Sequence, residues 1–251
     1  MAIKYWITGS GSGLGKYLLQ NLDSSQAFDP RTSLAQVNSD YIEEITLINC
    51  GFKRILHGQK VSYGDFHSNI LLQHQLSQLP FKRVILCSSV DVYPSDDVIN
   101  IETRQITNSN VKSIYSYQKL LNENFFLTAN SNTTVIRLPM IVGNGCQDNS
   151  VTKIISGSQL TLTHDSVINV IDYYSIMLFI GGIEKNSLSG IFNLVASQNS
   201  QLDSLASHLK RDIKYGSYRY ITPKVSNQKV IDLFPELDTT TVEVIKRCSL
   251  K

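Results

Sequence analysis

The sequence predicts an α/β fold in which a doubly wound parallel sheet is covered by helices. Two observations lead to this prediction. Short runs rich in β-branched residues alternate with stretches whose apolar residues recur at helical spacing, the order expected of successive βαβ units. In addition, a glycine-rich loop, TGSGSGLG at residues 8–15, follows the first β-type run directly and precedes a helical pattern.

The expected elements follow one another along the chain. The first strand, IKYWIT, is followed by the glycine loop and a short helix, KYLLQNL. EITLINC and RVILCSS are continuous, apolar and β-branched, which is typical of strands buried on both faces. The expected strands are residues 3–8, 44–50, 83–89, 133–141, 167–172 and 190–196. The expected helices are residues 16–22, 68–79, 115–130, a segment ending near 184, a segment starting near 202, and two short pieces around Pro235.

One part of the predicted sheet is short. Few residues separate the first helix from the strand at 44–50, whereas a complete dinucleotide fold would place one or two more strands there. Either residues 26–29 form a reduced second strand, or this part of the sheet has been cut down. We expect a dinucleotide-binding domain over residues 1–143 and a small C-terminal substrate-binding portion over 144–251, interleaved with the first.

Composition limits the class of protein. The chain has 251 residues, of which 42% are hydrophobic and 18% charged, as in ordinary globular domains. A net charge of +2 without a basic run argues against nucleic-acid binding. The four cysteines form no CxxC pair and the five histidines show no metal-ligand spacing, so neither a metal site nor a disulfide framework is expected. Without a signal peptide or a membrane-spanning run, a reducing cytoplasm is the expected location.

The glycine loop predicts a dinucleotide site and a Rossmann-like sheet. Glycines allow the backbone to approach a pyrophosphate, and the following helix offers free N–H groups at its positive end. A carboxylate about twenty residues later would hold the adenosine ribose of NAD, and Asp29 has that place. Arg31 could instead bind the 2′-phosphate of NADP, as could Lys53 and Arg54. Three cations against one carboxylate favour NADP over NAD.

Tyr115 and Lys119 stand four residues apart in SIYSYQKLL, so both project from one face of the predicted helix. An ammonium beside a phenol favours the phenolate and so makes the tyrosine a usable proton donor or acceptor. A second pair, Tyr220 and Lys224, has the same spacing, but Pro223 lies between them and argues against a shared helix.

Several motifs in the same order resemble those of the short-chain dehydrogenase/reductase superfamily, in its extended, nucleotide-sugar-modifying branch (NAD-dependent epimerase/dehydratase). TGSGSGLG is similar to the TGxxxGxG loop, and CSSVDVYP to the SSxxVYG stretch that carries a catalytic serine, here Ser89. Tyr115 and Lys119 match YxxxK. INCG (48–51), HSNILL (67–72) and VIRLPMIVGNG (135–145) resemble the strand end near the coenzyme, the helix with a structural asparagine and the RLPxVYGPG segment.

The resemblance implies the residues of the site. The catalytic residues would be Ser89, Tyr115 and Lys119. The coenzyme would contact Thr8, Gly9, Ser10, Gly11, Ser12, Gly13, Leu14, Gly15, Asp29, Arg31, Asn49, Cys50, Gly51, Asn69, Tyr115, Lys119 and Pro139. The substrate would contact Ser88, Ser89, Val90, Asp91 and Met140. No metal is expected.

We therefore expect an NAD(P)-dependent oxidoreductase or epimerase that acts on a hydroxyl or keto group of a nucleotide sugar in cell-surface polysaccharide synthesis. A ketoreductase is favoured, because it needs only Ser89, Tyr115, Lys119 and the coenzyme. Dehydratases of this branch carry an Asp–Glu pair where this chain has Val90 and Asp91, which counts against a dehydratase. The alternative is a non-catalytic NAD(P)-binding sensor of the same fold. A homodimer formed by the helices at 68–79 and 115–130 is also expected, with Leu120, Leu121, Phe125 and Phe126 as its apolar side.

Overall fold

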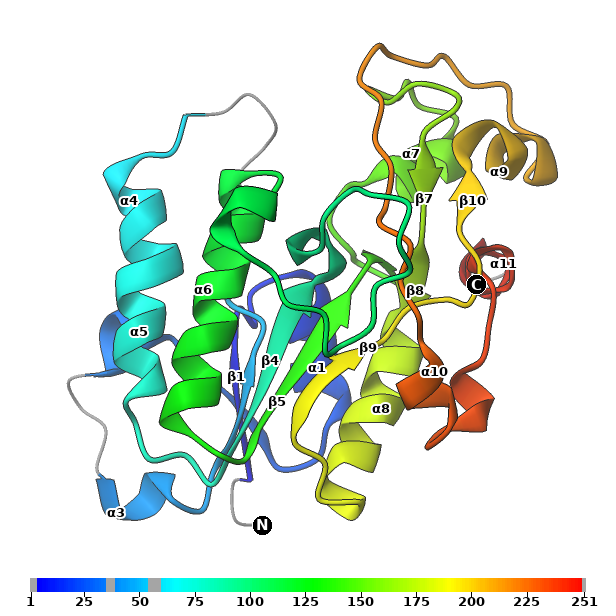
Figure 1. The fold of residues 1–251 in the computed structure, drawn as a ribbon. Helices are drawn as coiled ribbons and strands as arrows, with labels where there is room; N and C mark the ends of the chain where they lie inside the picture. The colour runs from blue at the N-terminus through cyan, green and yellow to red at the C-terminus, as the bar shows by residue number, and fades with distance from the viewer. Residues whose placement is uncertain (1–3, 35–38, 54–59, 250–251) are drawn as a thin grey trace.

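The computed structural model describes residues 4–34, 39–53 and 60–249. A parallel six-stranded sheet with strand order β2-β1-β3-β4-β5-β9 forms its centre (Figure 1). Its strands are β1 (Tyr5–Thr8), β2 (Ser25–Ala27), β3 (Thr46–Asn49), β4 (Arg83–Ser89), β5 (Thr133–Leu138) and β9 (Gly190–Asn193). The predicted α/β class with a Rossmann-like parallel sheet is confirmed.

Side chains that alternate along the central strands divide the core into two layers. From β4, Ile85 and Cys87 pack with helices α1 (Gly13–Asn21) and α8 (Tyr173–Lys185) on one face. Val84 and Leu86 pack with α5 (Leu72–Ser77) and α6 (Ile114–Ala129) on the other. Because both faces are covered, the middle residues of β3 (Leu47, Ile48) and β4 (84–87) are apolar on both faces, which is why their sequences read as continuous runs.

The short region after α1 forms a reduced second strand. Three residues of β2 pair in parallel with β1, Tyr5 opposite Ser25. Beyond β2, the described residues before β3 form only two single-turn helices, α2 (Pro30–Ser33) and α3 (Ser39–Ile42). The chain then returns to the other side of β1, where Thr8 lies opposite Asn49 of β3. The crevice between the carboxyl ends of β1 and β3 is therefore the point at which strand order reverses, where open α/β sheets bind ligands.

The helix expected at 68–79 is longer than its sequence pattern indicates. It begins as α4 (Tyr63–Phe66), passes through a π-helical turn, η2 (His67–Leu71), and continues as α5. Ser62 and Asp65 form a capping box at its start, in which each side chain binds the other's backbone N–H. The π turn carries Asn69 into the protein interior, where it is fully buried.

The C-terminal residues build a smaller unit with its own apolar cluster beside the sheet (Figure 1). Its helices include one not expected from the sequence, α7 (Ser150–Ser156), which Asn149 caps. The other elements of this part are β6 (Met140–Val142), β7 (Val167–Ile168), β8 (Val170–Asp172), β10 (Ser200–Gln201), α9 (Leu202–His208) and α11 (Thr241–Ser249). The short helices α10 (Gln228–Ile231) and η5 (Pro235–Leu237) instead pack with α8 in the core of the central sheet. Two single turns, η3 (Val90–Val92) and η4 (Asn108–Asn110), precede α6.

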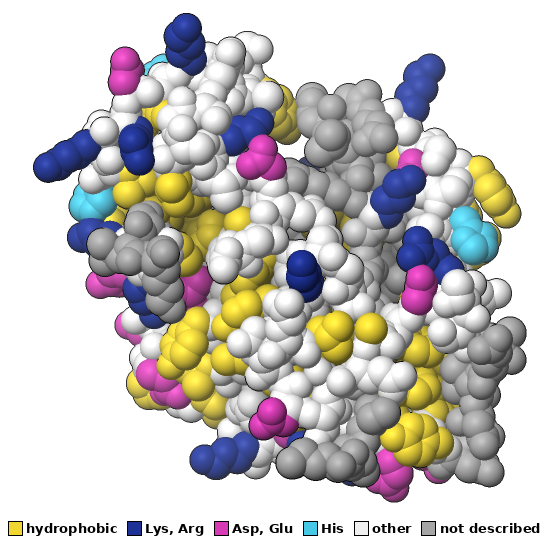
Figure 2. All heavy atoms as spheres, turned by 180° about the vertical axis from the view of Figure 1, so that it is seen from behind, with side chains coloured by type: hydrophobic (Ala, Val, Ile, Leu, Met, Phe, Trp, Pro, Cys, Tyr) yellow, Lys and Arg dark blue, Asp and Glu magenta, His cyan; other side chains and the backbone are white. Residues whose placement is uncertain are grey.

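On the back of the molecule, seen in Figure 2, the basic and acidic side chains of the described residues are not gathered into separate patches. Among the described residues on that face, Lys and Arg side chains are interspersed with Asp and Glu (Figure 2). None of the helices in the described ranges is both long and apolar enough to span a bilayer.

Candidate active site

The glycine loop lies at the carboxyl end of β1 and leads into α1. Gly9 has φ +65°, and a Cβ there would lie 2.9 Å from the carbonyl carbon of Cys50. A Cβ on Gly15 would lie 2.4 Å from the carbonyl oxygen of Gly9. Both positions thus need glycine because neighbouring backbone passes too close for a side chain. Gly11 and Ser12 are exposed at the tip of the loop, whereas Leu14 packs in the core.

Several residues that were predicted to contact the coenzyme form hydrogen bonds that fix the backbone at the carboxyl ends of β1 and β3. The hydroxyl of Thr8 donates to Asn49 Oδ1 at 2.7 Å and accepts from the N–H of Gly51 at 2.9 Å. Asn49 in turn donates to Gln73 Oε1 of α5 at 2.6 Å. Asn69 binds the backbone of Lys53 in both directions, at 2.8 and 2.9 Å. These side chains are buried and fix the loop after β3 against β1 and α5.

The two residues that were expected to compete for the adenosine ribose bind each other. Asp29 follows β2, and its carboxylate accepts hydrogen bonds from Arg31 Nε at 2.9 Å and from Arg31 Nη2 at 2.7 Å. The hydrogen bonds from Arg31 hold the pKa of Asp29 below its usual value. Lys53 forms an ion pair with Asp65 at 2.7 Å, and Arg54 lies outside the described residues.

Tyr115 and Lys119 project from the first two turns of α6 toward the ends of β3 and β4. Ser113 caps this helix by accepting from the N–H of Ser116. The ring of Phe52, just after β3, joins the two residues: it packs edge-on against Tyr115 at 5.3 Å and lies 4.2 Å from Lys119 Nζ. Lys119 also donates to the carbonyl oxygen of Cys87 at 2.9 Å, two residues before Ser89 on β4. The structure therefore brings the predicted tyrosine and lysine to the strand that ends in the predicted serine.

Burial changes the titration of Lys119. Only 9% of the residue is exposed, and this desolvation lowers the pKa of its ammonium from 10.5 to about 8. An ammonium with this pKa is still charged at neutral pH, where it favours the anionic form of a nearby phenol.

A second tyrosine, which the sequence pattern had set aside, joins the site. Tyr220 lies in the extended C-terminal segment, and its hydroxyl donates to Asp91 Oδ1 at 2.8 Å. Burial raises the pKa of Tyr220 well above its usual value, and Asp91 and the nearby Tyr115 add to this effect. Burial also raises the pKa of the Asp91 carboxyl. No local signal identifies Tyr220, because only the fold brings residue 220 beside residue 91.

The remaining predicted substrate residues have different surroundings. Ser89 is largely buried, and its hydroxyl accepts from the N–H of Asp91 at 3.2 Å. The Ser88 hydroxyl instead donates to the carboxylate of Glu123 in α6. Val90 packs in an apolar cluster with Val92 and Tyr93. Met140, at the start of β6, packs against the C-terminal cluster, and Pro139 precedes it between β5 and β6.

The residues around the glycine loop fit a dinucleotide. The N-cap of α1, Ser12, makes no side-chain capping bond, and the first turn holds no acidic residue, so its N–H groups are available to a pyrophosphate. A hollow of about 260 Å³ lies at this helix end. Its lining is formed by Gly11, Ser12, Gly13, Lys16, Tyr17, Gln20, Asn144 and Gly145.

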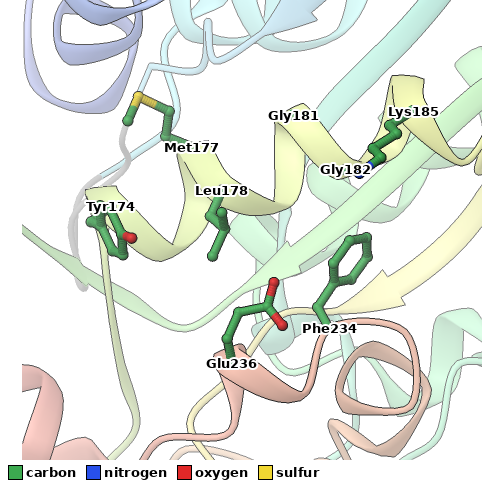
Figure 3. Close-up of a pocket in the computed structure, with 8 residues that line it drawn as sticks. All are labelled: Tyr174, Met177, Leu178, Gly181, Gly182, Lys185, Phe234 and Glu236. Carbon is green, nitrogen blue, oxygen red and sulfur yellow. The ribbon is translucent and has the colours of Figure 1, made fainter.

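A larger groove of about 380 Å³ lies away from this chemistry, along the outer side of α8 (Figure 3). It is lined by Tyr174, Met177, Leu178, Gly181, Gly182, Lys185, Phe234 and Glu236. Neither the glycine loop nor the Tyr115–Lys119 pair contributes to it, so the larger hollow is not the candidate active site.

The Rossmann-like fold and a family model together identify the class of protein as an NAD(P)-dependent enzyme of the epimerase/dehydratase type. The family model described as NAD dependent epimerase/dehydratase family matches residues 21–168. The chain belongs to this family, which confirms the predicted resemblance and the predicted class of enzyme. No curated protein sequence matches the chain significantly.

Solved structures share the fold along the whole chain. A dTDP-4-dehydrorhamnose reductase from Bacillus anthracis in complex with NADP has a TM-score of 0.81 and 17% identity, covering 100% of this chain and 98% of its own. A UDP-glucuronic acid 4-epimerase from Bacillus cereus, in complex with UDP-glucuronic acid and NAD, has a TM-score of 0.77 and 12% identity, covering 98% of each chain. A dTDP-4-dehydrorhamnose reductase from Clostridium acetobutylicum has a TM-score of 0.76 and 15% identity, again covering 98% of each.

Proposed function

We propose that this protein is an NAD(P)-dependent reductase of a keto group on a nucleotide sugar, with Ser89, Tyr115 and Lys119 as its catalytic residues. The observation that carries the proposal is the placement of Tyr115 and Lys119 around Phe52, at the carboxyl ends of β3 and β4 and next to the crevice between β1 and β3. A regulatory protein that only bound the coenzyme would have no need of this proton-transfer pair.

Each side chain has a distinct task in the proposed reaction. The nicotinamide, when bound, supplies or accepts the hydride. Tyr115 donates its phenolic proton to the substrate oxygen during reduction, and the Lys119 ammonium stabilises the phenolate that remains. Ser89 donates a hydrogen bond to the same oxygen and so orients it. The free N–H groups of α1 hold the pyrophosphate.

The substrate side of the proposal rests on Asp91 and Tyr220. Their hydrogen bond leaves the second carboxylate oxygen of Asp91 able to accept from a sugar hydroxyl. Tyr220 lies near enough to Tyr115 for the two to interact electrostatically, so the pair borders the place where the reacting carbon would have to be. Reductases and epimerases of nucleotide sugars with this fold support a nucleoside diphosphate as the carrier of the sugar.

Substitution of Tyr115 by Phe tests the reaction directly. With NADPH and a dTDP- or UDP-linked 4-keto sugar, Tyr115→Phe should lower kcat by about 100-fold or more, because it removes the proton donor. Coenzyme binding, followed by nicotinamide fluorescence, should change little. Tyr117→Phe is the matched control, since it removes a hydroxyl from the same helix two residues away.

Two results would contradict the proposal. Full turnover by the Tyr115→Phe enzyme would exclude Tyr115 as the proton donor. Coenzyme binding by the wild-type protein without turnover of any nucleotide sugar would favour the alternative, a non-catalytic NAD(P)-binding regulatory protein.

A further inference from the structure

Two cysteines that are distant in sequence meet on the floor of the proposed coenzyme cleft. The sulfur atoms of Cys50 and Cys87 are 3.5 Å apart, and both residues are free thiols. Cys50 follows the last residue of β3, and Cys87 lies in β4. The hydrogen-bonded register places Asn49 opposite Leu86, so Cys50 and Cys87, the next residue along each strand, face each other.

This placement is compatible with a disulfide. Neighbouring strands lie about 4.8 Å apart, inside the range of about 4.4 to 6.8 Å that disulfides require between Cα atoms. The two sulfurs already touch, so closing the bond needs side-chain rotation and a small backbone adjustment. The other two cysteines, Cys146 and Cys248, form no disulfide either.

The surroundings of the pair favour reaction at Cys87. Its pKa is lowered, first by the thiol of Cys50 as a hydrogen-bond donor and further by the charge of Lys119, although burial opposes both. A thiolate is the form of cysteine that attacks an oxidant. Cys50 is partly exposed to solvent and can serve as the second thiol.

We propose that Cys50 and Cys87 form a redox-active dithiol that hydroperoxides convert to a disulfide. The Cys87 thiolate attacks one peroxide oxygen, the O–O bond breaks, and a sulfenic acid forms while water or an alcohol leaves. The sulfur of Cys50 then attacks the Cys87 sulfur, loses its proton, and displaces the hydroxyl group as water. Two thiols and one hydroperoxide thus yield one disulfide, one water and one further water or alcohol, and a dithiol reductant reverses the change.

The disulfide would act on the site described above. Cys87 supplies the carbonyl that holds Lys119 at 2.9 Å, and it immediately precedes Ser88 and Ser89. Drawing Cys87 toward β3 shifts that carbonyl and the end of β4. We expect this to weaken reduced-coenzyme binding or turnover by about tenfold or more, because a displacement of catalytic groups by about 1 Å can cost about 100-fold in rate. This second step rests on the proposed function, whereas formation of the bond does not.

The first experiment tests the bond alone. The full-length protein with Cys146→Ser and Cys248→Ser retains only the two facing thiols. Brief treatment with hydrogen peroxide should abolish its reaction with a thiol reagent, and peptide mass analysis should find Cys50 joined to Cys87. The same protein with Cys87→Ser cannot form the bond and is the matched control. Peroxide treatment that leaves both thiols reactive, or oxidises them without joining them, would overturn the proposal.

The second experiment measures the consequence. Affinity for NADPH or NADH, followed by nicotinamide fluorescence, should fall on oxidation and recover with dithiothreitol, and the Cys87→Ser control should not respond. If the bond forms and affinity and turnover are unchanged, the regulatory part is wrong although the dithiol is real. A reduced protein that binds neither coenzyme would instead contradict the proposed function.

Discussion

The Lys119 ammonium is charged and buried in the folded protein, and the cost of burying it should make the free energy of unfolding depend on pH. Burial lowers its pKa from 10.5 to about 8, so between these values the unfolded chain binds the proton more tightly than the folded one. Stability therefore rises with pH through this window. The full shift corresponds to about 3 kcal/mol of destabilisation below pH 8, which disappears above 10.5.

Substitution of Lys119 by Met isolates this effect. The quantity to follow is the free energy of unfolding of the wild type minus that of Lys119→Met. This difference should increase by about 2 to 3 kcal/mol when the pH is raised from 7 to 10. Urea unfolding of both proteins at several pH values measures the difference, in which the titration of other groups cancels. A difference independent of pH would show that Lys119 is not desolvated in the folded protein.

Arg31 should determine the choice of coenzyme, for which we propose NADP. The guanidinium already binds Asp29 through two hydrogen bonds, which offsets the carboxylate that would repel a 2′-phosphate. Arg31→Ala should weaken NADPH binding by about tenfold or more, the value of one hydrogen bond to a charged group, and leave NADH binding nearly unchanged. Fluorescence titration with each coenzyme measures this. Tighter binding of NADH by the wild type, unaltered in the variant, would show that NAD is preferred.

Local patterns in the sequence were enough to place the glycine loop after the first strand and Tyr115 and Lys119 on one helix, because each lies in one short motif on a single turn or helix. The catalytic roles of Tyr115 and Lys119 rest on the family resemblance and stay a prediction. They could not reveal Tyr220 beside Asp91 or the contact of Cys50 with Cys87, since these pairs depend on strand register and on the path of the C-terminal segment. Ser88 illustrates a further limit. It stands next to Ser89, but alternation along β4 sends its hydroxyl to Glu123.

At the level of elements, a buried ion pair fixes α6 to the sheet. Arg137 of β5 donates to Glu123 of α6 through Nε at 3.1 Å and Nη2 at 2.6 Å, and both residues are at most 2% exposed. The guanidinium also lies 4.6 Å from the centre of the Tyr93 ring. Because α6 carries Tyr115 and Lys119, this pair helps to hold them in place.

Removing one charge of the pair should be costly. Glu123→Gln leaves the Arg137 charge buried without a counter-charge, and we expect a loss of about 3 to 5 kcal/mol in the free energy of unfolding. The double variant Glu123→Leu with Arg137→Leu should cost clearly less, since no charge is then left unpaired. Urea unfolding of both variants decides the matter. Equal losses would contradict the prediction, because leaving the Arg137 charge unpaired would then cost no more than removing both charges.

The boundaries of elements were predicted less well than their existence. The strand at 83–89 and the helix at 115–130 agree with β4 and α6 within one residue, since long periodic segments and a serine cap mark them clearly. The helix α7 was not expected because it has only seven residues, too few for an apolar period to stand out. The second strand was ambiguous for the same reason: three residues of β2 carry hardly any pattern.

At the scale of the whole molecule, the expected homodimer stays a prediction, and the structure narrows the surface that would form it. Phe126 is fully buried in the chain's own core, and Leu120 packs against an internal cluster. The ring of Phe125 packs edge-on against His74 of α5 at 5.0 Å. Helices α5 and α6 run side by side on one face of the sheet (Figure 1), so the outer side of this helix pair is the candidate interface.

Two exposed apolar side chains, on the helical turns that lead into α5, support the outer side of this helix pair as the interface. Phe66 is 43% exposed and Leu71 39% exposed. If this surface pairs with its copy, Phe66→Glu should convert a dimer into a monomer without unfolding it, because the side chain is not part of the chain's own core. Ile99→Glu, at a 64% exposed site outside these helices, is the matched control and should leave the dimer intact. Light scattering at micromolar concentration gives the mass of each protein, and a monomeric mass for the wild type would refute the dimer.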